Sequence, residues 1–166
     1  AVAKRIMSSI ANSYDSASQA TQLAAFTKAI VYSISDTATN IGAAAGSGLN
    51  EAVNIIATTA VTVAQRDVID AANNSGANTY NITDTAANIA AAGNTKLSTA
   101  QTVTAINDAT VAQAGTIQAF AKAVVYDVTG TATQLAAAAA ASLNDAVNIV
   151  ATTAATVAEA GTIDGR

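Results

Sequence analysis

Residues 32–41 read Tyr-Ser-Ile-Ser-Asp-Thr-Ala-Thr-Asn-Ile. The pattern returns from Tyr80 as Tyr-Asn-Ile-Thr-Asp-Thr-Ala-Ala-Asn-Ile and from Tyr126 as Tyr-Asp-Val-Thr-Gly-Thr-Ala-Thr-Gln-Leu, at offsets of 48 and 46 residues. A second stretch, Leu-Asn-Glu-Ala-Val-Asn-Ile-Ile-Ala-Thr-Thr-Ala at 49–60, returns at 143–154 with two changes, Glu to Asp and Ile to Val. Self-similarity at a period of this length predicts a stack of like units.

The repeats divide the chain into an array and a leading segment. Residues 1–20 match the repeat least, and we expect them to form an N-terminal cap or an irregular segment. The array covers 21–166, and its parts are a partial unit and three full units at 21–30, 31–78, 79–124 and 125–166.

Each unit is expected to hold two modules in which a strand is followed by a helix. In the first module an alternating stretch such as 79–83 favours a strand, and Asp36 or Asp84 then stands where a helix N-cap is expected. In the second module the β-branched residues of 53–58 favour a strand, and Thr62 begins a helical pattern.

Alternating strands and helices with short connections imply parallel strands joined by right-handed crossovers. The predicted fold class is therefore α/β, with the repeated modules stacked into a parallel α/β solenoid. An open parallel sheet with helices on both faces has the same local pattern and stays open as the alternative. A bundle of helices alone is favoured by the alanine content but opposed by the recurring Tyr-x-Ile and Val-Asn-Ile-Ile runs.

The composition removes most kinds of chemistry. The 166 residues include 45 Ala and 23 Thr but no Pro, Cys, His or Trp. Thiol nucleophiles, imidazole acid–base catalysis and Cys/His zinc sites are excluded, so we expect no enzyme, no cofactor and no metal site. A net charge of −4 argues against nucleic acid as a partner, because that requires clustered Lys and Arg. No apolar run approaches the roughly 20 residues that span a bilayer, so membrane insertion is not expected.

Polar residues recur at fixed places in the unit. Asp36 and Asp84 match each other, with Gly130 in the third unit. Such a pair could bind a cation or serve as acid and base, but helix capping is favoured because one copy lacks the carboxylate. Recurring amides are expected to form ladders along the stack, in preference to a polar ligand groove; they are Asn40, Asn88, Gln134, Asn54 and Asn148.

Aromatic and hydroxyl side chains also recur. Tyr32, Tyr80 and Tyr126 are expected to form a packing ladder, and the functional alternative is an exposed aromatic row that stacks on sugars or bases. The Thr-Ala-Thr runs at 37–39 and 131–133 invite an ice-binding interpretation. They are expected at helix starts and not on a flat sheet, so ice binding is a remote alternative.

The runs Ser-Asp-Thr-Ala-Thr-Asn-Ile at 35–41 and Thr-Asp-Thr-Ala-Ala-Asn-Ile at 83–89, with Leu-Asn-Glu-Ala-Val-Asn-Ile and Thr-Val-Ala-Gln, resemble repeat segments of very large bacterial exoproteins. Those are secreted or surface proteins of cyanobacteria and proteobacteria that often carry haemolysin-type (RTX) calcium-binding repeats. The resemblance covers roughly residues 22–163 and implies export, an extracellular or cell-surface location, and a scaffold or adhesive role. The Gly-Gly-x-Gly-x-Asp calcium nonapeptide does not occur, so calcium binding by that route is not expected.

The sequence therefore predicts a non-enzymatic structural repeat module of a bacterial extracellular or cell-surface protein. Low charge and open sheet edges at the ends of the stack favour self-association end to end into fibres or layers. The alternative is an adhesive or carbohydrate-binding module that holds a surface glycan on a face of repeated Tyr and Asn residues.

Overall fold

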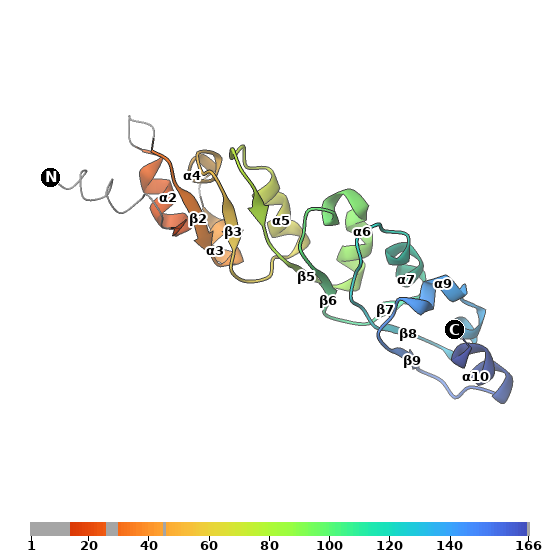
Figure 1. The fold of residues 1–166 in the computed structure, drawn as a ribbon. Coiled ribbons are helices and arrows are strands. Elements are labelled where there is room, and N and C mark those ends of the chain that lie inside the picture. Colours follow the sequence, from red (N-terminus) through yellow and green to blue (C-terminus); the bar gives the residue numbers. More distant parts are fainter. Residues whose placement is uncertain (1–13, 26–29, 45, 166) are drawn as a thin grey trace. The chain divides into compact units, whose positions relative to one another are not determined.

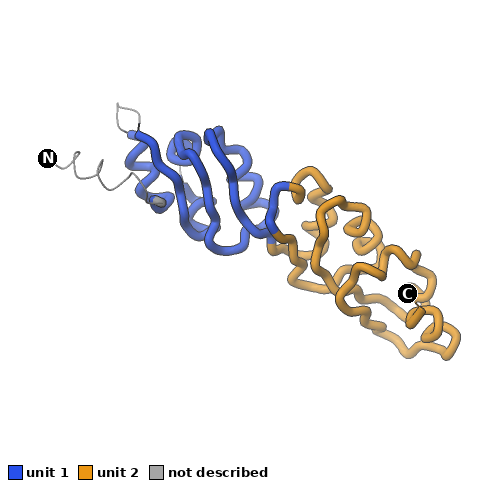
Figure 2. Tube along the Cα trace, in the orientation of Figure 1, with its two compact units in different colours: residues 1–82, 99–101 blue, residues 83–98, 102–166 orange. Residues whose placement is uncertain are grey.

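The computed structural model describes residues 14–25, 30–44 and 46–165, and it shows a mixed α/β chain. Contacts divide the chain into two compact units, shown in Figure 2. Unit 1 comprises residues 1–82 and 99–101, and unit 2 comprises residues 83–98 and 102–166. Most of the N-terminal cap or irregular segment expected at 1–20 lies outside the described residues.

Unit 1 is built on a parallel sheet whose short strands follow one another in chain order (Figure 1). The strands are β1 (Tyr14–Asp15), β2 (Ser33–Asp36), β3 (Ile55–Ala57) and β4 (Asn78–Thr79). Paired residues are 19 apart between β1 and β2, 21 apart between β2 and β3, and 23 apart between β3 and β4. Each strand of the sheet therefore belongs to one strand–helix segment of about half a repeat.

Helices connect the strands of unit 1. They are α2 (Ala17–Leu23) after β1, α3 (Ala38–Ala43) and α4 (Gly46–Asn50) after β2, and α5 (Val63–Asp70) after β3. Helix α2 packs against α4, and α3 packs against α5, so helices of successive segments are neighbours. Gly48 of α4 lies so close to α2 that a larger residue would not fit. A Cβ at this position would lie 2.8 Å from the backbone nitrogen of Thr21.

Unit 2 has the same kind of architecture. One sheet pairs β5 (Ile82–Asp84) with β6 (Val103–Ala105), and Ile82 itself belongs to unit 1. The other is a parallel sheet of β7 (Ala109–Thr110), β8 (Val128–Gly130) and β9 (Ile149–Ala151). Its helices are α6 (Ala86–Leu97), α7 (Val111–Gln118), α8 (Ala132–Ala137), α9 (Ala140–Asn144) and α10 (Val157–Asp164). Helix α7 packs against α6 and α9, and α8 packs against α10.

One hydrogen bond occurs in all three repeats at the same spacing. Its acceptors are the carbonyl oxygens of Tyr32, Tyr80 and Tyr126, and its donors are the N–H groups 21 residues later, with distances of 2.7, 2.9 and 2.9 Å. The donors are Val53, Gln101 and Val147. Each repeat thus has a first half that begins at its tyrosine and a second half that begins at the donor residue.

The helical part of every first half is interrupted at the same place. The interruption separates α3 from α4 and α8 from α9, and within α6 it is a kink at Gly93. Gly93 has a φ of 75°, a conformation that glycine adopts without a steric penalty. The three first halves therefore share a strand, a helix, a break and a second helical turn.

The core consists of aliphatic residues from the strands and the helices, of helix alanines and of the repeated tyrosines. Ile34, Ile41, Ile55 and Ile82 are fully buried, as are alanines such as Ala20 and Ala86. Strands are present throughout the described chain, so the reading as helices alone is wrong. The predicted α/β class is confirmed, and the structure shows it as a mixed chain with small parallel sheets. Among the described residues, no helix combines the length and apolar character needed to cross a bilayer.

Candidate functional site: the repeated aspartate and the helix starts

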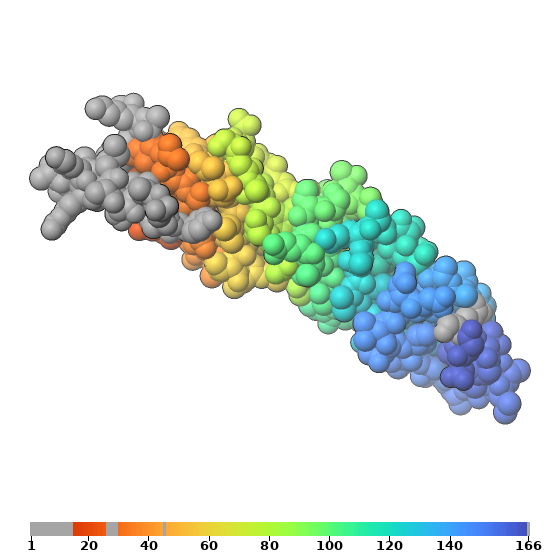
Figure 3. Space-filling view, in the orientation of Figure 1, coloured from red at the N-terminus to blue at the C-terminus, as the bar shows by residue number. Residues whose placement is uncertain are grey.

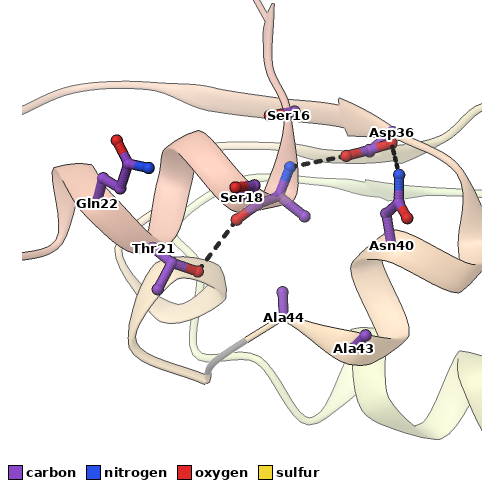
Figure 4. Close-up of a pocket in the computed structure, with 9 residues that line it drawn as sticks. Ser16, Ser18, Thr21, Gln22, Asp36, Asn40, Ala43 and Ala44 are labelled. Carbon is purple, nitrogen blue, oxygen red and sulfur yellow. Dashed lines mark hydrogen bonds between the residues drawn. The ribbon is translucent and has the colours of Figure 1, made fainter.

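Asp36 ends β2 and lies immediately before α3, where its carboxylate joins two helix starts (Figure 4). Its Oδ1 accepts hydrogen bonds from the Thr37 N–H and the Asn40 side-chain amide, both at 2.8 Å. Its Oδ2 accepts from the N–H of Ala17, the first residue of α2, at 3.0 Å. The carboxylate therefore satisfies backbone donors of its own segment and of the preceding segment.

The N-cap of α3 is Thr37, so the expectation that Asp36 itself is the N-cap is wrong by one residue. The Thr37 hydroxyl accepts from the Asn40 N–H at 3.2 Å, and Thr85 does the same for Asn88 in α6. A hydroxyl on the N-cap residue reaches this N–H, while the carboxylate one residue earlier reaches the N-cap's own N–H. Asp84 stands before the N-cap Thr85 in the same way.

The second copy repeats these contacts, and the third replaces them. Asp84 Oδ1 accepts from the Thr85 N–H at 2.7 Å and from the Asn88 amide at 2.8 Å. In the third copy, where Gly130 has no side chain, Gln134 Oε1 accepts the N–H of the N-cap Thr131 at 2.9 Å. Where the second copy has Asp84 and Asn88, the third has Gly130 and Gln134. The N–H of the N-cap threonine therefore has an acceptor in both copies.

Hydrogen bonding favours the ionised form of Asp36. The Asn40 amide, followed by the N–H groups of Ala17 and Thr37, holds the pKa of this carboxyl below its usual value, although burial acts in the opposite direction. An ionised carboxylate beside two helix starts is also favoured by their dipoles. The group thus acts as a hydrogen-bond acceptor for the starts of α2 and α3.

A shallow hollow lies beside Asp36, between α2 and α3 (Figure 4). It is lined by Ser16, Ala17, Ser18, Thr21, Gln22, Asp36, Asn40, Ala43 and Ala44. Asp36 is the single carboxylate in this lining, and the rest are small or neutral side chains. The described residues contain no cluster of three or more His, Cys, Asp or Glu side chains that could hold a metal ion.

Helix starts in the first halves receive a further bond, from the segment that follows. The N–H of the first residue of α3, Ala38, donates to Thr59 Oγ1 at 3.0 Å. The equivalent bonds are Ala86 N–H to Asn107 Oδ1 at 2.9 Å and Ala132 N–H to Thr153 Oγ1 at 3.0 Å. Every one spans 21 residues, so each second half caps the helix of the first half before it.

Second-half helices begin with a capping box, a local motif that the sequence prediction did not use. In α5, α7 and α10 a Thr N-cap is bonded reciprocally to a Gln or Glu three residues later. The signature Ser/Thr-x-x-Gln/Glu before an apolar stretch identifies such helix starts from sequence alone. Side chains such as Thr59 have no local signature, because their partner lies in another segment.

The expected amide ladder is wrong. Asn40 and Asn88 donate to the aspartates of their own segments, and Asn54 donates to Ser33 Oγ at 3.3 Å. Asn148 donates to Asp127 Oδ1 at 3.0 Å. Each of these bonds joins the amide to a side chain of its own segment or of the segment before it, so the bonds do not run from copy to copy.

The repeated tyrosines are core residues, so these three side chains do not form an exposed aromatic row. Tyr32, Tyr80 and Tyr126 are 2, 1 and 3% exposed. The Tyr32 hydroxyl donates to the Gly48 carbonyl oxygen at 2.7 Å, and the Tyr80 hydroxyl donates to Asp70 at 2.8 Å. Burial, then the charges of Glu51 and Asp15, raises the pKa of Tyr32 to about 12. The rings are also two strands apart within unit 1, so they pack in equivalent places without stacking on each other.

Asp70 connects Tyr80 to an ion pair within α5. Arg66 Nη2 lies 2.6 Å from Asp70 Oδ2, and the Thr99 hydroxyl donates to the same oxygen at 3.3 Å. These groups link α5 to the segment that follows it.

Comparison of the chain with protein-family models, with curated proteins and with solved structures finds no match.

Proposed function

We propose that this chain is a non-enzymatic structural repeat module in which first and second halves stack alternately as a parallel α/β solenoid. The observation that carries the proposal is the 21-residue hydrogen bond from a helix start to a side chain of the next segment, present in all three repeats. These polar side chains join one segment to the next in each repeat.

The proposal includes end-to-end association into fibres or layers, outside the cell or on its surface. A parallel sheet built one strand at a time has two edges, and an edge with unpaired backbone groups favours pairing with another chain. The residues of β9 are half-buried or exposed, and Val147, just before the strand, is 64% exposed. Low net charge opposes such contact only weakly.

Sedimentation velocity and electron microscopy over a concentration series test the association. We expect larger species, and then ordered fibres or layers, as the concentration rises. A monodisperse monomer at every concentration would contradict end-to-end association. Surface labelling of intact producing cells with an antibody against the chain tests the location, and labelling only after lysis would contradict it.

A further inference from the structure

The chain contains two similar copies of one segment that differ in how far they are buried, so the two copies can be compared directly. Residues 49–70 and 143–164 are identical at 15 of 22 positions. In the first copy Ile55, Val61 and Ile69 are fully buried. In the second copy α10 has no buried residue, and Val157 is 91% exposed. Figure 3 shows this copy in blue at the surface of unit 2.

The first copy is covered by the segment that follows it, residues 73–82. The Ile55 N–H donates to the Ala77 carbonyl oxygen at 3.1 Å, and the Val61 N–H donates to the Asn81 carbonyl oxygen at 2.8 Å. Strand β4 pairs with β3, and Val61 forms a parallel bridge with Ile82. The covering segment therefore adds a parallel strand and closes the core over the segment.

Side chains set the register of the covering segment. The Asn73 N–H donates to Asn50 Oδ1 at 2.9 Å, and the Ala77 N–H donates to Asn54 Oδ1 at 3.0 Å. Asn78 donates to Asp70 Oδ1 at 3.3 Å, the carboxylate that also accepts from Tyr80. The counterparts of these three acceptors in the second copy are conserved in kind, and they are Asn144, Asn148 and Asp164.

Gly76 restricts what can cover the segment. A Cβ at this position would lie 2.5 Å from both the Val53 carbonyl oxygen and Asn54 Oδ1. The same two groups recur as Val147 and Asn148 in the second copy. An incoming strand that follows the same backbone path as residues 73–82 therefore needs glycine at this point.

We propose that β9 and α10 form a docking site for one kind of partner, an extended polypeptide segment of the pattern Asn-x-x-Gly-x-Asn-x-Tyr-x-Ile that enters as a parallel strand. The Ile149 and Ala155 N–H groups donate to its backbone, and Asn144, Asn148 and Asp164 receive its amide and hydroxyl donors. Its aliphatic residue covers the hollow lined by Ala151, Ala155, Val157, Ala160, Gly161, Ile163 and Asp164. The inference rests on the proposed stacking, because it continues the contact of residues 49–70 with 73–82 beyond the last described segment.

The test uses the full chain and a synthetic peptide that copies residues 73–84. Titration followed by hydrogen exchange is expected to show saturable binding and slower exchange of the Ile149 and Ala155 amides. A matched peptide with Gly76→Ala is expected to bind about ten-fold more weakly or not at all, because its methyl group overlaps the two acceptors. Equal binding of the two peptides would overturn the inference. In the chain, Ile149→Pro removes the edge donor and is expected to abolish binding.

A second test joins the segment covalently to the chain, which avoids the translational and rotational entropy lost when a separate short peptide binds. Arg166 corresponds to Ala72 in the comparison of the two copies, so appending a copy of residues 73–98 after Arg166 keeps the register. The appended chain is expected to protect the same two amides, and appended Gly76→Ala is expected to fail. Unprotected amides in the appended chain would overturn the inference. If the unmodified chain still assembles with concentration in that case, the proposed function stands without this site; if it does not, both fail.

Discussion

At the scale of single residues, Asp36 shows how one carboxylate accepts hydrogen bonds from two helix starts. It accepts from Ala17, Thr37 and Asn40, and so it connects the start of α3 to the start of α2. Sequence reasoning identified Asp36 and Asp84 as capping residues from their position before a helical pattern. It could not place the bond to Ala17, because that partner lies 19 residues away and depends on strand register.

Removing this carboxylate is expected to destabilise the fold. Asp36→Ala leaves the Ala17 and Thr37 N–H groups without their acceptor, and we expect a loss of about 1–2 kcal/mol in the free energy of unfolding. Asp108→Ala is the matched control, because the Asp108 carboxylate has no hydrogen bond to the described residues, and a change within about 0.5 kcal/mol is expected. Equal effects in urea denaturation would contradict the role given to Asp36.

The lowered pKa of Asp36 predicts a dependence of stability on pH. A carboxyl whose pKa is lower in the folded state stabilises the fold above its unfolded pKa, near 3.8, and loses this effect as the pH falls through the folded value. The difference in unfolding free energy between the native chain and Asp36→Asn is therefore expected to be constant from pH 7 to 5 and to shrink below pH 4. Denaturant titrations across this range measure it, and a difference that persists unchanged in acid would contradict the prediction.

At the scale of the element, each first-half helix starts with help from another segment. Thr59, Asn107 and Thr153 occupy one position of the second half and bond the first N–H of the preceding helix. Sequence patterns predicted the strands and helices, because hydrophobic period and cap residues are local signals. Sequence patterns could not predict that Thr59 and not its neighbour Thr58 bonds the Ala38 N–H, since the register of β2 on β3 decides which hydroxyl reaches it.

Replacing the bonding hydroxyl tests this contact. Thr59→Val removes the acceptor of the Ala38 N–H with little change of shape, and a loss of about 1 kcal/mol is expected. Thr58→Val is the control, because the Thr58 side chain is exposed and its backbone bond to Asp36 is retained. Asn107→Thr installs the residue of the other two repeats and is expected to be tolerated. Thermal unfolding of the three variants measures the differences, and a Thr58→Val loss equal to that of Thr59→Val would refute the assignment.

Close packing of α4 on α2 gives a second test at this scale. Gly48→Ala places a methyl group 2.8 Å from the Thr21 backbone nitrogen, and the overpacking is expected to destabilise the chain by about 1–3 kcal/mol. Gly46→Ala in the same helix meets nothing within 4 Å and is expected to leave stability unchanged or raise it slightly. Urea midpoints of both variants decide the question, and similar midpoints would show that α4 does not approach α2 this closely.

At the scale of the whole molecule, the repeat itself is the main source of predictive power. The period followed from self-similarity, whereas the α/β class and the two segments per repeat followed from local strand and helix patterns within each repeat. The amide and tyrosine ladders did not, because two segments per repeat place identical side chains on alternate strands. The same alternation underlies the proposed stacking, in which each kind of segment covers the other.

Small-angle scattering of a lengthened chain tests that stacking most directly. A variant that carries residues 53–146 twice in tandem keeps the register, since Val147 corresponds to Val53, and it is about 1.6 times as long. A solenoid grows along one axis, so the account predicts an unchanged cross-sectional radius and a maximum dimension that rises about 1.6-fold. A compact particle, whose dimensions all rise together by only about 1.2-fold, would contradict it.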